Sequence, residues 1–195
     1  MQGVRAAETR YGFQFPPAYR ALLIGGHLKA RGDGLLALTD LEWLTPSEIA
    51  VYEPFRPLAA PLVPFATTAR VDEWCWRLDW QEAGEPAIVL RERGESGLGY
   101  APDFRGFLYR VLLEELSGTW LVEGPDDTEG QAVVRQSIAV AAPHLPAAWA
   151  DHLQTLAAKP WKRSRDGTVR AFPRSHCDRI VARALAFLHM DEEFY

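Results

Sequence analysis

Residues 62–116 read LVPFATTARVDEWCWRLDWQEAGEPAIVLRERGESGLGYAPDFRGFLYRVLLEEL and decide the fold. Apolar side chains recur at every second position in the first two thirds of this stretch, and at helical spacing in the last third. A two-residue repeat predicts a strand with one buried face, and a repeat of three to four residues predicts an amphipathic helix. The stretch therefore predicts an antiparallel-rich sheet closed by a helix, within an α+β fold.

Tryptophans dominate the first strand of this stretch. Four apolar residues share one face of an extended chain here: Trp74, Trp76, Leu78 and Trp80. Residues 87–90 are apolar on both faces and follow a Gly84-Glu85-Pro86 turn, which predicts a more central, antiparallel neighbour. The tryptophan face could stack bases or sugars if it were open. We expect it to be core instead, because the closing helix needs an apolar surface to cover.

The closing helix is predicted from Phe104 onward. Its apolar stripe consists of Phe104, Phe107, Leu108, Val111, Leu112 and Leu116. Upstream, the spacing predicts helices over residues 3–11 and from Pro16-Pro17 to Gly25-Gly26, and a short strand over residues 35–38. Thr45 and Glu48 have the spacing of a capping box at the start of a brief helix.

Five motifs, in this order, resemble the SMI1/KNR4 family, also called the SUKH superfamily, over residues 3–117. They are Phe15–Leu23 (L-P-x-x-Y-x-x-x-L), Leu62–Ala66 (L-x-P-F-A), Trp76–Asp79 (W-x-x-D), Pro86–Val89 (P-x-V) and Ala101–Leu108 (A-x-x-F-x-x-F-L). The resemblance implies a non-catalytic protein-binding domain without a cofactor. Many bacterial members look like immunity proteins that neutralise a toxin, often a nuclease, whereas fungal members resemble regulatory scaffolds.

The chain is rich in Ala, Arg and Pro, which is typical of a high-GC bacterium, so the resemblance favours a bacterial immunity protein. A regulatory or scaffold protein is the alternative within the family. The partner would be a basic toxin domain, and the oligomeric state is left open by the sequence.

An acidic, Gly- and Pro-bearing segment over residues 123–130 predicts a boundary. We therefore expect an α+β domain over residues 1–122 and a mainly helical extension over residues 123–195. Within the extension, Asp166-Gly167 predicts a small hairpin. Ser175 and Asp178 have the spacing of a helix cap and its third residue.

Composition excludes several classes of protein. The chain has 195 residues, 48% of them hydrophobic, and no run of about 20 apolar residues that could span a membrane. It begins without the apolar core of a signal peptide, so we expect a cytoplasmic protein. Two cysteines cannot build a disulfide framework, and the five histidines are too scattered for a metal site. We therefore assign no catalytic and no metal-ligating residues.

Charge is unevenly distributed along the chain. Residues 159–183 contain eight Lys or Arg against two Asp, although the whole chain carries a net charge of −5. This basic segment could dock on the acidic remainder, form a solvated face, or contact nucleic-acid phosphates with Trp161 and Phe172 interleaved among its cations. We expect one of the first two and not a nucleic-acid partner, because the acidic chain as a whole would repel a nucleic acid.

Carboxylates gather around the predicted central strands. Four of them are expected to form an acidic rim that binds a basic partner: Asp72, Glu73, Glu82 and Glu85. Complementary charge of this kind mainly speeds encounter and selects the partner.

Overall fold

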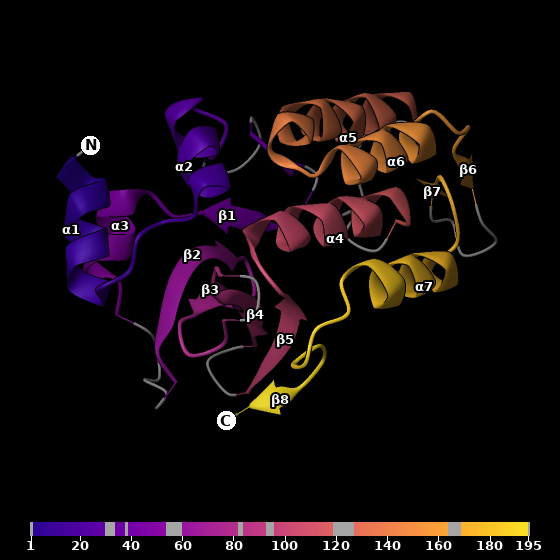
Figure 1. The fold of residues 1–195 in the computed structure, drawn as a ribbon. Helices are drawn as coiled ribbons and strands as arrows, with labels where there is room; N and C mark the ends of the chain where they lie inside the picture. Colours follow the sequence, from indigo (N-terminus) through magenta and orange to yellow (C-terminus); the bar gives the residue numbers. More distant parts are fainter. Residues whose placement is uncertain are drawn as a thin grey trace.

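The structure is a computed structural model that describes residues 2–29, 34–37, 39–53, 60–81, 84–92, 96–118, 127–163 and 169–194 (Figure 1). Its described part is an α+β protein, as predicted, in which helices pack on an antiparallel sheet. The strands, in their order across the sheet, are β1 (Leu41–Trp43), β2 (Leu62–Thr68), β3 (Glu73–Arg77), β4 (Ala87–Arg91), β5 (Gly97–Ala101) and β8 (Glu193–Phe194).

Three helices precede or interrupt the start of the sheet: α1 (Gln2–Tyr11), α2 (Pro17–Ile24) and α3 (Pro46–Val51). The capping box of Thr45 and Glu48 forms at the start of α3, as predicted. The Arg10 guanidinium of α1 donates hydrogen bonds to the carbonyl oxygens of Ala50 and Tyr52, so it joins α1 to the end of α3.

The strand predicted over residues 35–38 is wrong in its described part, because residues 34–37 form a turn. Leu35 and Leu36 are nevertheless buried. The Trp43 indole donates a hydrogen bond to the Leu35 carbonyl oxygen, so the turn is fastened to β1. The apolar run reflects burial of a turn, which periodicity alone cannot distinguish from a short strand.

The closing helix α4 (Phe104–Leu116) begins at Asp103, whose carboxylate accepts a hydrogen bond from the Gly106 amide. It covers one face of the sheet, where the ring centroids of Phe65 and Trp76 lie 4.6 Å apart. Trp74 and Trp76 are buried in this core, as predicted. Figure 1 shows α4 between the sheet and the α5–α6 pair.

Trp80 was expected on the same face as Trp76, and this is wrong. β3 ends at Arg77, and the Trp80 amide donates a hydrogen bond to the Arg77 carbonyl oxygen across a turn. The turn breaks the two-residue alternation, so Trp80 joins Cys75 in a second, smaller cluster on the opposite face of the sheet.

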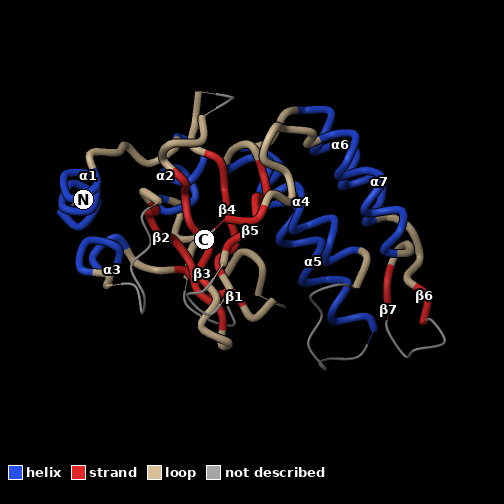
Figure 2. Tube along the Cα trace, turned by 90° about the horizontal axis from the view of Figure 1, so that it is seen from below, coloured by secondary structure: helices blue, strands red, loops and turns tan. Residues whose placement is uncertain are grey.

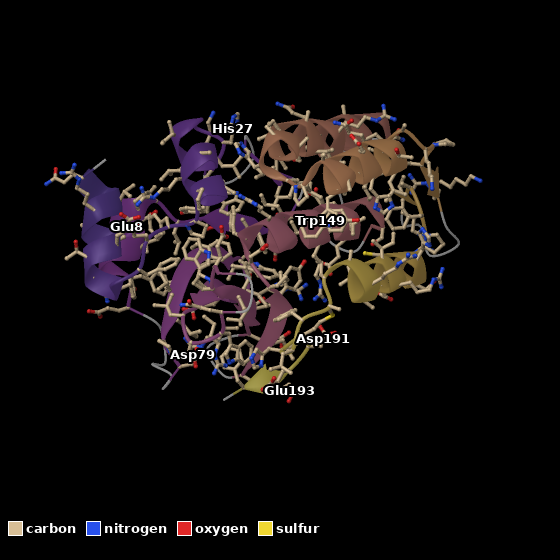
Figure 3. All side chains as sticks on the ribbon, in the orientation of Figure 1. Glu8, His27, Asp79, Trp149, Asp191 and Glu193 are labelled. Atoms are coloured by element: carbon tan, nitrogen blue, oxygen red, sulfur yellow. The ribbon has the colours of Figure 1, made fainter. Side chains whose placement is uncertain are left out.

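The C-terminal part is mainly helical, as expected, and packs on α4. It consists of α5 (Asp127–Ala141), the 3-10 helix η1 (Ala142–His144), α6 (Ala147–Ala157), the hairpin strands β6 (Lys162–Arg163) and β7 (Val169–Arg170), and α7 (Arg174–Ala184). Buried apolar residues of α5, α6 and α7, such as Val134, Leu153 and Val181, belong to the same core cluster as Trp76. Figure 3 shows Trp149 of α6 beside α4, where its ring stacks on Tyr109 at 4.7 Å.

β8, at the end of this C-terminal part, is the sixth strand of the main sheet. The predicted boundary at 122/123 falls among residues 119–126, which lie outside the described residues, so it stays a prediction. β6 and β7 pair as an antiparallel hairpin, as predicted, although the Asp166-Gly167 turn itself is outside the described residues. The predicted Ser175 cap is wrong, because α7 already begins at Arg174 with Pro173 as its N-cap residue.

Candidate protein-binding site

The turn between β2 and β3 is held by a compact set of hydrogen bonds around Thr68. The Thr68 hydroxyl oxygen accepts from the amides of Arg70 and Asp72, each at 3.2 Å, and the hydroxyl donates to the Asp72 carboxylate at 3.1 Å. The Val71 amide also donates to the Thr68 carbonyl oxygen at 3.0 Å. These hydrogen bonds hold the amides of Arg70, Val71 and Asp72 in place.

Val71 occupies this turn in an unfavourable conformation. Its φ angle is 67°, in the left-handed region, where a β-branched residue is a genuine outlier. Its side chain is 59% exposed, so burial of the valine does not compensate for the backbone cost. Strain of this kind persists only where the surroundings impose it, and it concentrates at functional sites. The turn thus presents one apolar side chain to solvent in a fixed position.

Strand register places further charged residues at this end of the sheet. Leu41 pairs with Thr68, so Asp40 precedes β1 here, and Glu92 follows β4 at the same end because Arg91 pairs with Glu73. Arg70 and Glu92 are exposed, and Asp40 and Asp72 are partly exposed. We call this set the hairpin-end surface: Asp40, Arg70, Val71, Asp72 and Glu92.

Glu73 was expected on the acidic rim, and the structure places it inside the protein instead. It is only 3% exposed, because the face of β3 that carries Glu73 is covered as well as the tryptophan face. One carboxylate oxygen lies 2.7 Å from the Arg91 guanidinium, and the other accepts a hydrogen bond of 2.6 Å from the Tyr52 hydroxyl. Glu73 can therefore position the end of the sheet, but it cannot touch a partner directly.

Glu85 lies at the other end of the sheet, because it precedes β4 where β3 has just ended. The five residues of β3 lie between Asp72 and the end of the sheet that carries Glu85. At about 3.3 Å per residue, they separate Glu85 from Asp72 by roughly 16 Å. Glu85 is partly buried beside the start of α4, where burial and then the charge of Asp103 raise the pKa of its carboxyl. Glu82 is outside the described residues. Asp72 and Glu85 thus do not form one continuous rim.

Both cysteines are buried. Burial raises the pKa of the Cys177 thiol to about 12 and that of the Cys75 thiol well above its usual range, so neither is a reactive thiolate at neutral pH. In the described ranges, no group of three or more His, Cys, Asp or Glu side chains is arranged to hold a metal ion. Within those ranges, too, no helix has the length and apolar character to cross a membrane.

No family model matches the chain, and comparisons with curated proteins and with solved structures found no match. The resemblance to SMI1/KNR4 proteins therefore remains a prediction from the five sequence motifs.

Proposed function

We propose that the chain is a non-catalytic protein-binding protein, namely a bacterial immunity protein that neutralises a cognate toxin, such as a nuclease, by direct binding in the cytoplasm. The positions of the motifs support this proposal. Leu62–Ala66 lies in β2, Pro86–Val89 enters β4, and Ala101–Leu108 joins the end of β5 to α4. These three motifs lie on the sheet and its closing helix, which supports the proposal.

The observation that carries the proposal is the strained, exposed Val71 in a turn fixed by Thr68. A valine in the left-handed region costs of order 1–3 kcal/mol, which a glycine would not. The side chain is exposed, so it contributes little to the core in return. A rigid apolar contact flanked by Arg70 and Asp72 has the composition of an interface centre with a polar rim.

The proposed mechanism is stoichiometric occlusion. Asp40, Asp72 and Glu92 present negative charge at the hairpin-end surface. A nuclease needs cationic side chains to hold phosphates, and carboxylates at these positions complement them. The buried pair of Glu73 and Arg91 would hold the surface in shape without touching the toxin.

Co-expression tests the proposal. The tagged chain is produced together with the product of each neighbouring gene, and complexes are captured and identified by mass spectrometry. We expect one neighbour to be toxic alone, harmless with this chain, and recovered with it in equal amounts. Failure to bind or inhibit any neighbour would remove the proposal. Capture of several partners, none of them toxic, would favour a regulatory or scaffold protein instead.

A further inference from the structure

A second charged surface lies in the C-terminal part of the chain. Its cations come from the end of α6, from the β6–β7 hairpin and from α7, and we call it the basic face: Lys159, Lys162, Arg163, Arg170, Arg174, Arg179 and Arg183. Within the described residues 159–163 and 169–185, Asp178 is the single acidic residue. Figures 1 and 2 both show β6, β7 and α7 side by side, away from α1 and α3.

The cations of the basic face point to solvent. Six of the seven are exposed, and Arg170 is partly exposed. The apolar side of α7 faces inward, since Cys177, Val181 and Leu185 are buried in the core that contains α4. The exposure of Lys159, Lys162, Arg174, Arg179 and Arg183 agrees with the expectation of a solvated face.

We propose that the basic face binds the phosphate backbone of a nucleic acid. Five of its seven cations are arginines, whose planar guanidinium groups bind phosphate oxygens in pairs. The cations come from a hairpin and a neighbouring helix, and Lys162 pairs with Arg170 across the hairpin. This arrangement spreads positive charge over a surface, which suits a repeating polyanion.

Recognition at this face is independent of base sequence. Phe172 is buried, and the indole nitrogen of the partly buried Trp161 is enclosed. The aromatic rings that the sequence places among the cations are therefore not a free platform for stacking bases. Binding would rest on phosphate contacts, and its strength would depend steeply on salt.

An anionic membrane fits the basic face less well. Membrane-surface helices bury an exposed apolar face in the lipid while their cations contact headgroups. Val181 of α7 and Leu185, the residue that ends the helix, are already buried against the protein. On the described part of α7, Ile180 is only partly exposed and the exposed Ala182 is small, while Leu188 beyond the helix is 78% exposed. This is a small apolar surface for insertion into lipid, so we expect nucleic acid and not lipid.

The net negative charge of the chain does not prevent this binding. At physiological salt, the interaction between exposed charges is largely screened when they are more than about 8 Å apart. Figure 3 shows Glu8, Asp79 and Glu193 away from the β6–β7 end. A phosphate at the basic face is thus governed mainly by the nearby arginines and lysines.

Fluorescence anisotropy with a labelled random-sequence DNA duplex and the matching RNA duplex tests the inference. The probe variant carries Arg174→Gln and Arg179→Gln, both on the exposed side of α7. The matched control carries Arg5→Gln and Lys29→Gln, which remove the same charge from exposed sites outside the basic face. We expect the probe variant to bind at least tenfold more weakly at low salt, and its log–log salt slope to fall by about two. The control should bind as the wild type does.

Three results would overturn the inference. The first is the absence of binding to either duplex at low salt. The second is an equal loss of affinity in the probe and control variants, which would mean that binding depends on the net charge of the chain and not on the basic face. The third is binding that does not require a nucleic acid. Polyglutamate would then displace the labelled duplex as well as unlabelled duplex does, or phosphatidylserine vesicles would bind the chain as tightly as the duplex. None of these results bears on toxin binding at the hairpin-end surface.

Discussion

Glu73 and Arg91 lie directly opposite each other on β3 and β4, and their carboxylate and guanidinium form a buried ion pair at 2.7 Å. The Tyr52 hydroxyl binds the same carboxylate, so the pair also fastens the chain after α3 to the sheet. Removal of one partner from a buried ion pair leaves an uncompensated charge, whereas replacement of both by apolar residues is often tolerated.

We therefore expect Arg91→Met to lower the free energy of unfolding by about 3–5 kcal/mol. The double variant Glu73→Leu with Arg91→Met should recover a large part of that loss. Urea denaturation monitored by tryptophan fluorescence measures both. A loss below about 1 kcal/mol in Arg91→Met would contradict the structural role given to the pair.

Thr68→Val tests the turn that holds Val71. Valine keeps the shape and branching of threonine, but it removes the hydroxyl that makes three hydrogen bonds within the turn. We expect a loss of about 1–2 kcal/mol in the free energy of unfolding. Amide exchange should quicken at Arg70 and Asp72 and stay unchanged in α4. Unchanged protection at Arg70 and Asp72 would show that the hydroxyl does not order the turn.

Glu115 should make stability depend on pH. It is 1% exposed in α4, and neither carboxylate oxygen has a hydrogen-bond partner among the residues that the structure describes. Burial raises its pKa from 4.5 to about 8. Below pH 4.5 both folded and unfolded chains are protonated at this site. Between 4.5 and 8 only the unfolded chain gives up the proton, so the free energy of unfolding falls as the pH rises and then levels off.

Glu115→Met isolates this effect, because the difference in unfolding free energy between wild type and variant cancels the other titrating groups. That difference should grow by a few kcal/mol in favour of the variant between pH 4.5 and 8. A difference that is constant over this range would mean that Glu115 ionises normally in the folded protein.

Gly99→Ala should release the C-terminal segment from the sheet. A Cβ atom at this position would overlap the His189 carbonyl oxygen. The backbone after His189 cannot easily move away, because the Gly99 amide donates a hydrogen bond to the Glu192 carbonyl oxygen and the Asp191 amide donates one to the Gly99 carbonyl oxygen. We expect a loss of about 2–3 kcal/mol and faster cleavage by carboxypeptidase. In a chain that ends at Ala186, the His189 backbone that the new Cβ atom would meet is absent. The same substitution should therefore change the free energy of unfolding of that chain only slightly. An equal cost in both chains would contradict this explanation.

Local patterns predicted much of the fold. The helices α1, α2 and α4, and the capping box of α3, follow from apolar spacing and from Gly, Pro and Thr at their ends. β8 could not be predicted, because it has two residues and exists only through its pairing with β5. β5 was not predicted either, because glycines at two of its five positions disfavour a strand. Those glycines make room for Phe194 and His189, which lie far away in the sequence.

The candidate site was predictable only in part. Asp72 is at a sheet end, but the assumption that nearby carboxylates form one rim failed, because β3 separates Asp72 from Glu85. Glu73 is buried because both faces of β3 are covered, which its own sequence does not reveal. Asp40 joins the surface through strand pairing alone. The left-handed conformation of Val71 has no sequence signal, since valine normally avoids it.

Val71→Gly separates binding from stability and tests the central claim most directly. Glycine adopts the left-handed conformation without strain, so the variant should unfold with about 1 kcal/mol more free energy than the wild type. It should nevertheless bind the toxin identified by co-expression at least tenfold more weakly, as measured by isothermal titration calorimetry. Ile24→Ala, which removes an exposed apolar side chain from α2, should bind as the wild type does. Wild-type affinity in Val71→Gly would contradict the assignment of the hairpin-end surface as the toxin-binding site.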